Sequence, residues 1–161
     1  MPLLPDDAPE LMALLPAYRK ARLAGLIICV AWPLLLMAMV ATGAVRPGAA
    51  PMEGPARQIG YTFTCLVFLS AAWVTWRSGK VLKEFRDLAP ELRPRVILRE
   101  SLIYAALFES SSLWGLLYWM MVGMNAARYV GTFMALTPLM FFLFVPRFHA
   151  WKLALEREEG A

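Results

Sequence analysis

Four apolar segments, each long enough to cross a lipid bilayer, constrain this chain more than any other feature. They lie at about residues 22–43, 59–76, 101–123 and 128–146 and contain almost no charged residues. A helix needs about 20 apolar residues to cross the hydrocarbon core, and it satisfies its own backbone hydrogen bonds without water. The sequence therefore predicts an all-α membrane protein with four transmembrane helices in two antiparallel hairpins, forming a single domain over residues 1–161.

Composition and charge agree with this interpretation. Hydrophobic residues make up 60% of the 161 residues, against roughly 45–50% in soluble domains. The net charge of +4 does not indicate nucleic-acid binding, because most basic residues flank the apolar segments. They gather before the first segment, between the second and third, and after the fourth. By the positive-inside rule, we expect both termini in the cytoplasm and a multi-pass protein of the bacterial cytoplasmic (inner) membrane.

The remaining segments are short. Residues 1–21 are expected to form a cytoplasmic or interfacial helix capped by Asp6 and Asp7, or else a frayed tail. Residues 44–58 contain three prolines and two glycines, which predicts a loop on the opposite side of the membrane. Residues 77–100 form a cytoplasmic connection, and the third and fourth segments are separated by only a short turn around Asn125.

The sequence holds few groups that carry out chemistry by themselves. Cys29 and Cys65 both lie inside apolar segments, where a thiol most often acts as a small hydrophobic side chain. His149 is the single histidine, so we expect no metal site and no cofactor. The chain also lacks a nucleophile–base pair and a phosphate-binding loop, which argues against an enzyme.

Glu109 is the one acidic residue inside the four apolar segments. A carboxylate in hydrocarbon is costly, so such a residue is protonated, paired or used. Small residues such as Ala105 and Ala106 share its helix face, which predicts that Glu109 points into the bundle. The opposite aromatic face, with Trp114 and Tyr118, is expected to meet lipid or a partner. Because burial disfavours the charged form and no basic residue is expected at this depth, we expect Glu109 to be neutral.

Other unusual residues are expected at the same depth, roughly 12–15 Å from the cytoplasmic boundary. Pro33 and Pro138 are expected to kink their helices and to free the carbonyl groups of Cys29 and Met134. These carbonyls and nearby hydroxyls would accept a hydrogen bond from protonated Glu109 or would bind a small cation with its carboxylate. The candidate proton- or ion-binding residues are Glu109, Ser112, Ser110, Thr137 and Ser70.

The window AALFESSSLWGLLYWMMVG resembles the carboxylate-bearing helix of the proteolipid c subunits of rotary ATPases. Those helices typically carry an essential Glu followed by a Gly-Leu pair, here Glu109, Gly115 and Leu116. The resemblance implies that Glu109 matches the proton- or sodium-binding carboxylate, with nearby hydroxyls as co-ligands. The first apolar segment lacks the glycine-rich sequence of ring-forming proteolipids, so the resemblance points to a bacterial four-span membrane protein with such a helix, and not to an ATPase rotor.

Two functions remain open. In the first, the chain is a proton- or cation-coupled membrane component in which Glu109 changes its protonation or binds a cation. In the alternative, it is a non-catalytic accessory or assembly subunit in which Glu109 hydrogen-bonds a neighbouring helix. Besides the lipid bilayer, the first function requires self-association or a partner subunit, because four helices are too few for a transporter built from internal repeats. The alternative places the chain within a larger membrane complex by definition.

Overall fold

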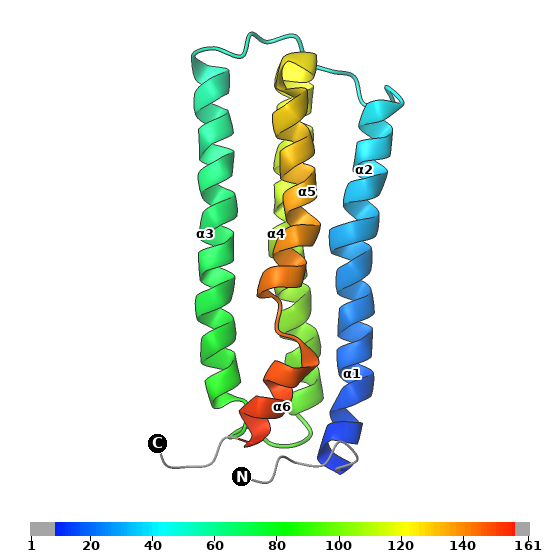
Figure 1. Cartoon of the computed structure of the whole chain (residues 1–161), viewed down its shortest axis with the longest axis vertical. Helices are drawn as coiled ribbons and strands as arrows, with labels where there is room; N and C mark the ends of the chain where they lie inside the picture. Colours follow the sequence, from blue (N-terminus) through cyan, green and yellow to red (C-terminus); the bar gives the residue numbers. More distant parts are fainter. Residues whose placement is uncertain (1–8, 157–161) are drawn as a thin grey trace.

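The computed structural model describes residues 9–156, and helices are the only regular secondary structure in this range. The first three elements follow one another without a break: α1 (Pro9–Leu26), the π-helix η1 (Ile27–Ala31) and α2 (Trp32–Ala41). Together they form one long rod, called the α1–α2 rod below (Figure 1). The predicted helix at residues 1–21 is therefore continuous with the first apolar segment from Pro9 onward, while Asp6 and Asp7 lie outside the described residues.

The remaining elements are α3 (Pro55–Glu84), α4 (Arg93–Val122), the 3-10 helix η2 (Gly123–Ala126), α5 (Ala127–Phe144) and α6 (Phe148–Glu156). Figure 1 shows that α4 runs in the same direction as the α1–α2 rod, whereas α3 and α5 run the opposite way. The short α6 lies at the end of the bundle where α1 begins and α3 ends, called the terminal end below. Residues 42–54 cross the opposite end, called the loop end.

Prolines and glycines explain several helix boundaries. Pro55 begins α3, and Pro94 lies in the first turn of α4, where a missing N–H removes no helical hydrogen bond. Gly123 ends α4 with a φ of 66°, a conformation that residues with a side chain rarely adopt. α5 ends at Phe144, two residues before Pro146. It continues through Pro138, which the sequence predicted as a kink.

Three helical stretches of the described chain are long and apolar enough to cross a membrane: Leu11–Ala41, Pro55–Glu84 and Arg93–Glu156. The third stretch turns back on itself at η2 and holds both α4 and α5. The structure is thus all-helical and compatible with a multi-pass membrane protein. Four separate crossings and the orientation of the termini stay predictions.

α4 is the central helix, since α5, the α1–α2 rod and α3 all pack against it. The prediction that its aromatic face meets lipid or a partner is therefore wrong. Tyr118 is 2% exposed, and Trp114 stacks on Phe63 of α3 with ring centroids 4.9 Å apart. Helical periodicity located this face correctly on α4, but it could not show that α3 covers it.

The most extensive helix contact of the described chain joins α4 to α5. A Cβ atom added at Gly115 would lie 3.0 Å from the Cβ of Phe133 and 3.2 Å from the carbonyl oxygen of Val130. The Ser111 hydroxyl donates a hydrogen bond of 2.8 Å to the Phe133 carbonyl. Small residues at this interface let the two backbones approach each other closely. The short η2 connects the two helices, so α4 and α5 form an antiparallel hairpin.

The loop at residues 42–54 is fastened to the end of α4. The Gly48 N–H donates to the Trp119 carbonyl at 3.0 Å, and the Ala50 N–H donates to the Met121 carbonyl at 3.1 Å. The Trp119 indole N–H donates in return to the Val45 carbonyl at 3.1 Å. Gly48 and Gly123 touch through their backbones, so neither position has room for a side chain. The loop therefore runs over the end of α4 to reach α3. Figure 1 shows the α1–α2 rod and α3 on opposite sides of α4 and α5, so the first of the two predicted antiparallel hairpins is wrong: the two helices do not pack against each other.

These contacts predict unequal effects at two glycines that both have positive φ. Gly123→Ala should lower the free energy of unfolding by about 1–3 kcal/mol more than Gly43→Ala, because a Cβ at Gly123 would strike the Gly48 carbonyl. Gly43, with a φ of 73°, has no atom within 4 Å of the added Cβ and shares only the backbone strain. Thermal unfolding of both variants in detergent, followed by circular dichroism, measures the difference. Equal losses would contradict the close contact.

Candidate functional site

Two buried acids lie on opposite sides of α4. Glu100 and Glu109 are nine residues apart, which rotates their side chains by about 180° at roughly 100° per residue. Glu100 contacts Arg77 of α3, whereas Glu109 lies on the side of α4 that carries Ala105 and its contact with Cys29 of η1. The two carboxyl groups therefore occupy different environments within one helix.

Glu100 is fully buried and paired with two arginines. Arg77 donates from Nη2 to Oε1 at 2.8 Å and from Nε to Oε2 at 2.9 Å, and Arg99 Nη2 donates to Oε1 at 2.9 Å. The planar guanidinium of Arg77 matches both carboxylate oxygens and holds the group in its ionised form. Sequence reasoning missed this pair, although a signal existed: Arg77 and Glu100 directly flank two apolar segments at the same boundary.

Glu109 has none of these partners. Its side chain is 8% exposed, and neither of its oxygens has a hydrogen-bond partner among the described residues. Cys29 lies close enough for the charges of the two groups to interact, and its thiol donates to the Ala105 carbonyl, one helical turn before Glu109, at 3.3 Å. Glu109 is thus a buried carboxyl at the interface of α4 with the α1–α2 rod, as its small neighbours predicted.

The part of the rod nearest to Glu109 departs from regular α-helix. In η1 the helix widens, and the Trp32 N–H bonds to the Ile27 carbonyl five residues earlier. Pro33 follows directly, is buried and has no N–H to donate. The rod and α4 run in the same direction, so one turn beyond the contact between Cys29 and Ala105 brings Pro33 and Glu109 to a similar level. Widened turns of this kind occur frequently at functional sites.

The predicted co-ligand hydroxyls are engaged elsewhere. Ser112 and Thr137 bond to each other at 2.7 Å, and Thr137 donates to the Phe108 carbonyl at 3.1 Å, which joins α4 to α5. Ser110 and Ser70 donate to carbonyls of their own helices, those of Leu107 and Leu66. The structure therefore brings Ser112 and Thr137 together near the level of Glu109, but no hydroxyl bonds to its carboxyl.

Ser70 lies on a different side of α4 from Glu109. It lines an open groove between α3 and α4 together with Ile103 and Leu107. At roughly 100° per residue, Leu107 lies about 160° from Glu109 around α4. Ser70 thus faces the side of α4 away from the candidate carboxyl. The expected release of the carbonyls of Cys29 and Met134 stays a prediction.

The chain matches no known family model, no curated protein and no solved structure at a significant level. The likeness of the Glu109 window to proteolipid c subunits therefore stays a resemblance of sequence alone. Several buried polar atoms of the described chain lack a hydrogen-bond partner, and Glu109 is the one residue among them whose two oxygens both lack one.

The bridge between α4 and α5 predicts which hydroxyl matters for stability. Thr137→Val should lower the free energy of unfolding by about 0.5–1.5 kcal/mol, because it leaves Ser112 and the Phe108 carbonyl without their shared partner. Ser110→Ala should change it much less, since Ser110 bonds only within its own helix. Unfolding by added dodecyl sulfate in mixed micelles measures both. A larger effect of Ser110→Ala would contradict this arrangement.

The paired acid predicts a second difference. Arg77→Gln should destabilise the protein by about 1–3 kcal/mol, because Glu100 stays buried and keeps Arg99 as its one charged partner among the described residues. Lys80→Gln is the matched control, since the Lys80 ammonium lies 3.9 Å from Glu84 in an exposed pair, which contributes less than about 1 kcal/mol. The unfolding midpoints of the two variants in detergent, measured at low and at high salt, distinguish the loss of the buried pair from the loss of the exposed pair. Equal loss in both variants would place the Arg77 pair among ordinary surface contacts.

Proposed function

We propose that this chain is a small multi-pass membrane component that carries a proton on Glu109. One observation carries the proposal: the Glu109 carboxyl is 8% exposed and bonds to no group of the described chain. An ionised carboxylate without a partner is strongly disfavoured in such surroundings, whereas a neutral carboxyl is tolerated. A purely structural acid would be expected to use its O–H on a neighbouring helix, and Glu109 makes no such bond.

A proton is better supported than a metal cation. A small hard cation needs several oxygen ligands around it. None of the candidate hydroxyls of Ser70, Ser110, Ser112 and Thr137 forms a hydrogen bond with Glu109, and each has another partner. A proton needs only the carboxyl and an acceptor reached by a small movement. The widened turn at η1 and the missing N–H of Pro33 interrupt the α-helical bonding pattern of the facing helix, and a backbone carbonyl released there would be such an acceptor.

We infer four membrane crossings, with α4 and α5 crossing separately. The 18 residues of α5 extend about 27 Å, which is close to the roughly 30 Å of a hydrocarbon core. Arg128 and Arg147 lie at its two ends. Basic residues are most frequent around the terminal end, which supports a cytoplasmic location for both termini in a bacterial inner membrane.

The proposal requires a partner. The described interior of the chain places no hydrogen-bonded or charged group on Glu109 to take its proton onward. The exposed apolar residues of the α1–α2 rod, such as Leu23, Ile27 and Leu34, leave that helix free to meet lipid or another subunit. We therefore propose that the chain works as an oligomer or within a larger membrane complex.

A hydrophobic carbodiimide tests the protonation of Glu109, because this reagent adds to a protonated carboxyl and not to a carboxylate. Glu100 serves as the internal control, since it is ionised and paired with Arg77. Both acids fall within one tryptic peptide between Arg99 and Arg128, so fragmentation in a mass spectrometer assigns the adduct directly. We expect modification at Glu109 alone, decreasing as the pH is raised from about 6 to 9, and no protection by sodium.

Other outcomes would redirect the proposal. Protection by sodium would identify a cation site in place of a proton site. Modification of Glu109 that stays constant over the whole pH range would mean a permanently neutral acid, and the role of accessory or assembly subunit would then explain the chain better. Glu109→Gln also distinguishes the proton carrier from the accessory subunit. The substitution removes the group that carries a proton but keeps a hydrogen-bonding side chain, so it should abolish the first role and leave the second nearly unchanged.

A further inference from the structure

A pocket of about 560 Å³ lies between α3 and the α4–α5 hairpin near the loop end. It is separate from Glu109, which contacts the α1–α2 rod on another side of α4. Its main lining residues are Arg57, Gly60, Tyr61, Tyr118, Tyr129 and Phe133. One guanidinium and three phenol rings thus surround a single cavity, an unusual concentration of hydrogen-bond donors in so apolar a protein.

These polar groups are held close to one another. Arg57 Nε donates to the Tyr61 hydroxyl at 3.0 Å, and the guanidinium lies 5.6 Å from the centre of the Tyr61 ring. Gly60 makes room for Tyr118, since a Cβ at Gly60 would lie 2.9 Å from the Tyr118 hydroxyl oxygen. Tyr129 lies near enough to interact electrostatically with both Arg57 and Tyr118.

The pocket carries a positive charge that the described residues do not neutralise. Arg57 forms no ion pair with an acidic residue of the described chain. Of its five N–H donors, one is used by Tyr61. The remaining donors and the neighbouring phenol groups therefore suit an anion with several acceptor oxygens, and a phosphate group has this chemistry.

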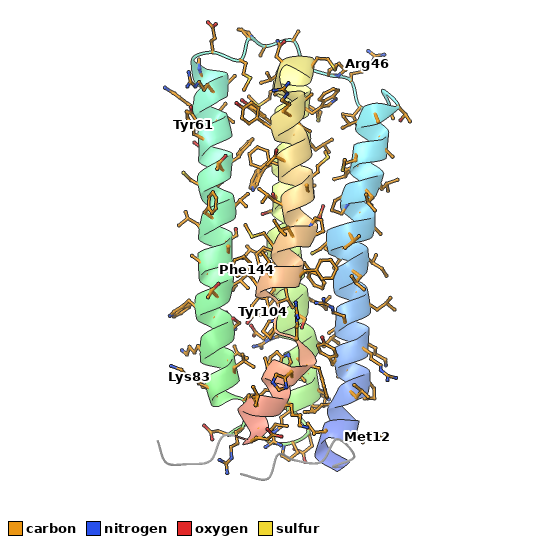
Figure 2. All side chains as sticks on the ribbon, in the orientation of Figure 1. Met12, Arg46, Tyr61, Lys83, Tyr104 and Phe144 are labelled. Atoms are coloured by element: carbon orange, nitrogen blue, oxygen red, sulfur yellow. The ribbon has the colours of Figure 1, made fainter. Side chains whose placement is uncertain are left out.

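The position of the pocket identifies the source of the phosphate. Arg57 lies in the first turn of α3, and Tyr61 marks the loop end of that helix in Figure 2. Aromatic and basic side chains at the ends of apolar helices lie at the level of lipid head groups. Tyr61 and Tyr129 are 59% and 54% exposed, so the pocket opens to its surroundings, while Phe133 and Met52 add apolar walls.

We propose that this pocket binds the phosphate of an anionic phospholipid from the leaflet at the loop end. Arg57 pairs with the phosphate, and the hydroxyls of Tyr118 and Tyr129 donate to its oxygens. The apolar part of the lipid lies against α3 and α5. The proposal is independent of the proton on Glu109, because no residue of the pocket contacts that carboxyl.

Native mass spectrometry of the full chain in detergent tests the proposal. The protein is mixed with equal amounts of phosphatidylglycerol and phosphatidylcholine, and the bound lipids are counted. We expect phosphatidylglycerol to be preferred, and Arg57→Gln to lower its binding about tenfold, as the loss of a charge-assisted contact implies. Tyr129→Phe should lower it less, because it removes one donor and keeps the ring.

Arg46→Gln is the matched control. Arg46 belongs to the same end of the molecule, is exposed, and lies over the other side of the bundle from Tyr61 (Figure 2). Arg46→Gln removes one positive charge, as Arg57→Gln does, but it changes no residue of the pocket. Phosphatidylglycerol binding should therefore be unchanged. Equal losses with Arg46→Gln and Arg57→Gln would overturn the proposal, because general surface charge would then explain the preference.

Two further results would overturn it. If inorganic phosphate at the same concentration displaced phosphatidylglycerol, the pocket would be a site for a soluble anion. If the native protein bound phosphatidylcholine equally well, the unpaired charge of Arg57 would have no role in binding. The unfolding midpoint of each variant in detergent checks that it is folded, and Tyr129→Phe carries the test if Arg57→Gln does not fold.

Discussion

A carboxyl group held among apolar helices must either be paired with a cation or be neutral, and α4 contains one acid that is paired and one that has no partner among the described residues. At Glu100, Arg77 supplies both hydrogen bonds that the carboxylate needs, which fastens α3 to α4 near the terminal end. At Glu109, on the other side of the helix, no described group pairs with either oxygen. The first acid therefore has a structural explanation, and the second calls for a functional one.

The packing around α4 keeps the second acid without a partner. Ser111 and Thr137 use their hydroxyls on backbone carbonyls across the interface of α4 and α5, so these groups stabilise the hairpin. The Cys29 thiol uses the Ala105 carbonyl in the same way. Each polar side chain near Glu109 is thus committed to helix packing. The widened turn before Pro33 differs from its surroundings, because there the backbone bonds over five residues in place of the usual four.

Much of the architecture could be predicted from the sequence, because long apolar segments and prolines act locally. The helical content, the tight turn at η2 and the burial of Glu109 agree with the structure. The loop predicted at residues 44–58 agrees up to residue 54, because Pro55 already begins α3. Spacing along a helix gives the direction of a side chain, but it does not reveal which helix lies in that direction. For this reason the sequence predicts that the aromatic face of α4 meets lipid or a partner, whereas in the structure α3 covers this face.

The same limitation applies to the candidate site. Ser110 and Ser70 were grouped with Glu109 by depth alone, and the structure turns them to carbonyls of their own helices. Arg77 belongs to the basic residues from which the sequence predicts topology, and the structure pairs it with Glu100 at the same boundary. Pairing between helices depends on how they are rotated, and a single sequence contains no direct record of that rotation.

Infrared difference spectroscopy of the Glu109 carboxyl tests the central claim most directly. The protein in lipid vesicles is compared with Glu109→Gln at neutral pH, in water and in deuterium oxide. We predict a carbonyl band of a protonated acid without a strong hydrogen bond, absent from the variant and shifted as its proton exchanges with deuterium. A carboxylate band at neutral pH, or a strongly hydrogen-bonded acid whose proton never exchanges, would contradict a proton carried by Glu109.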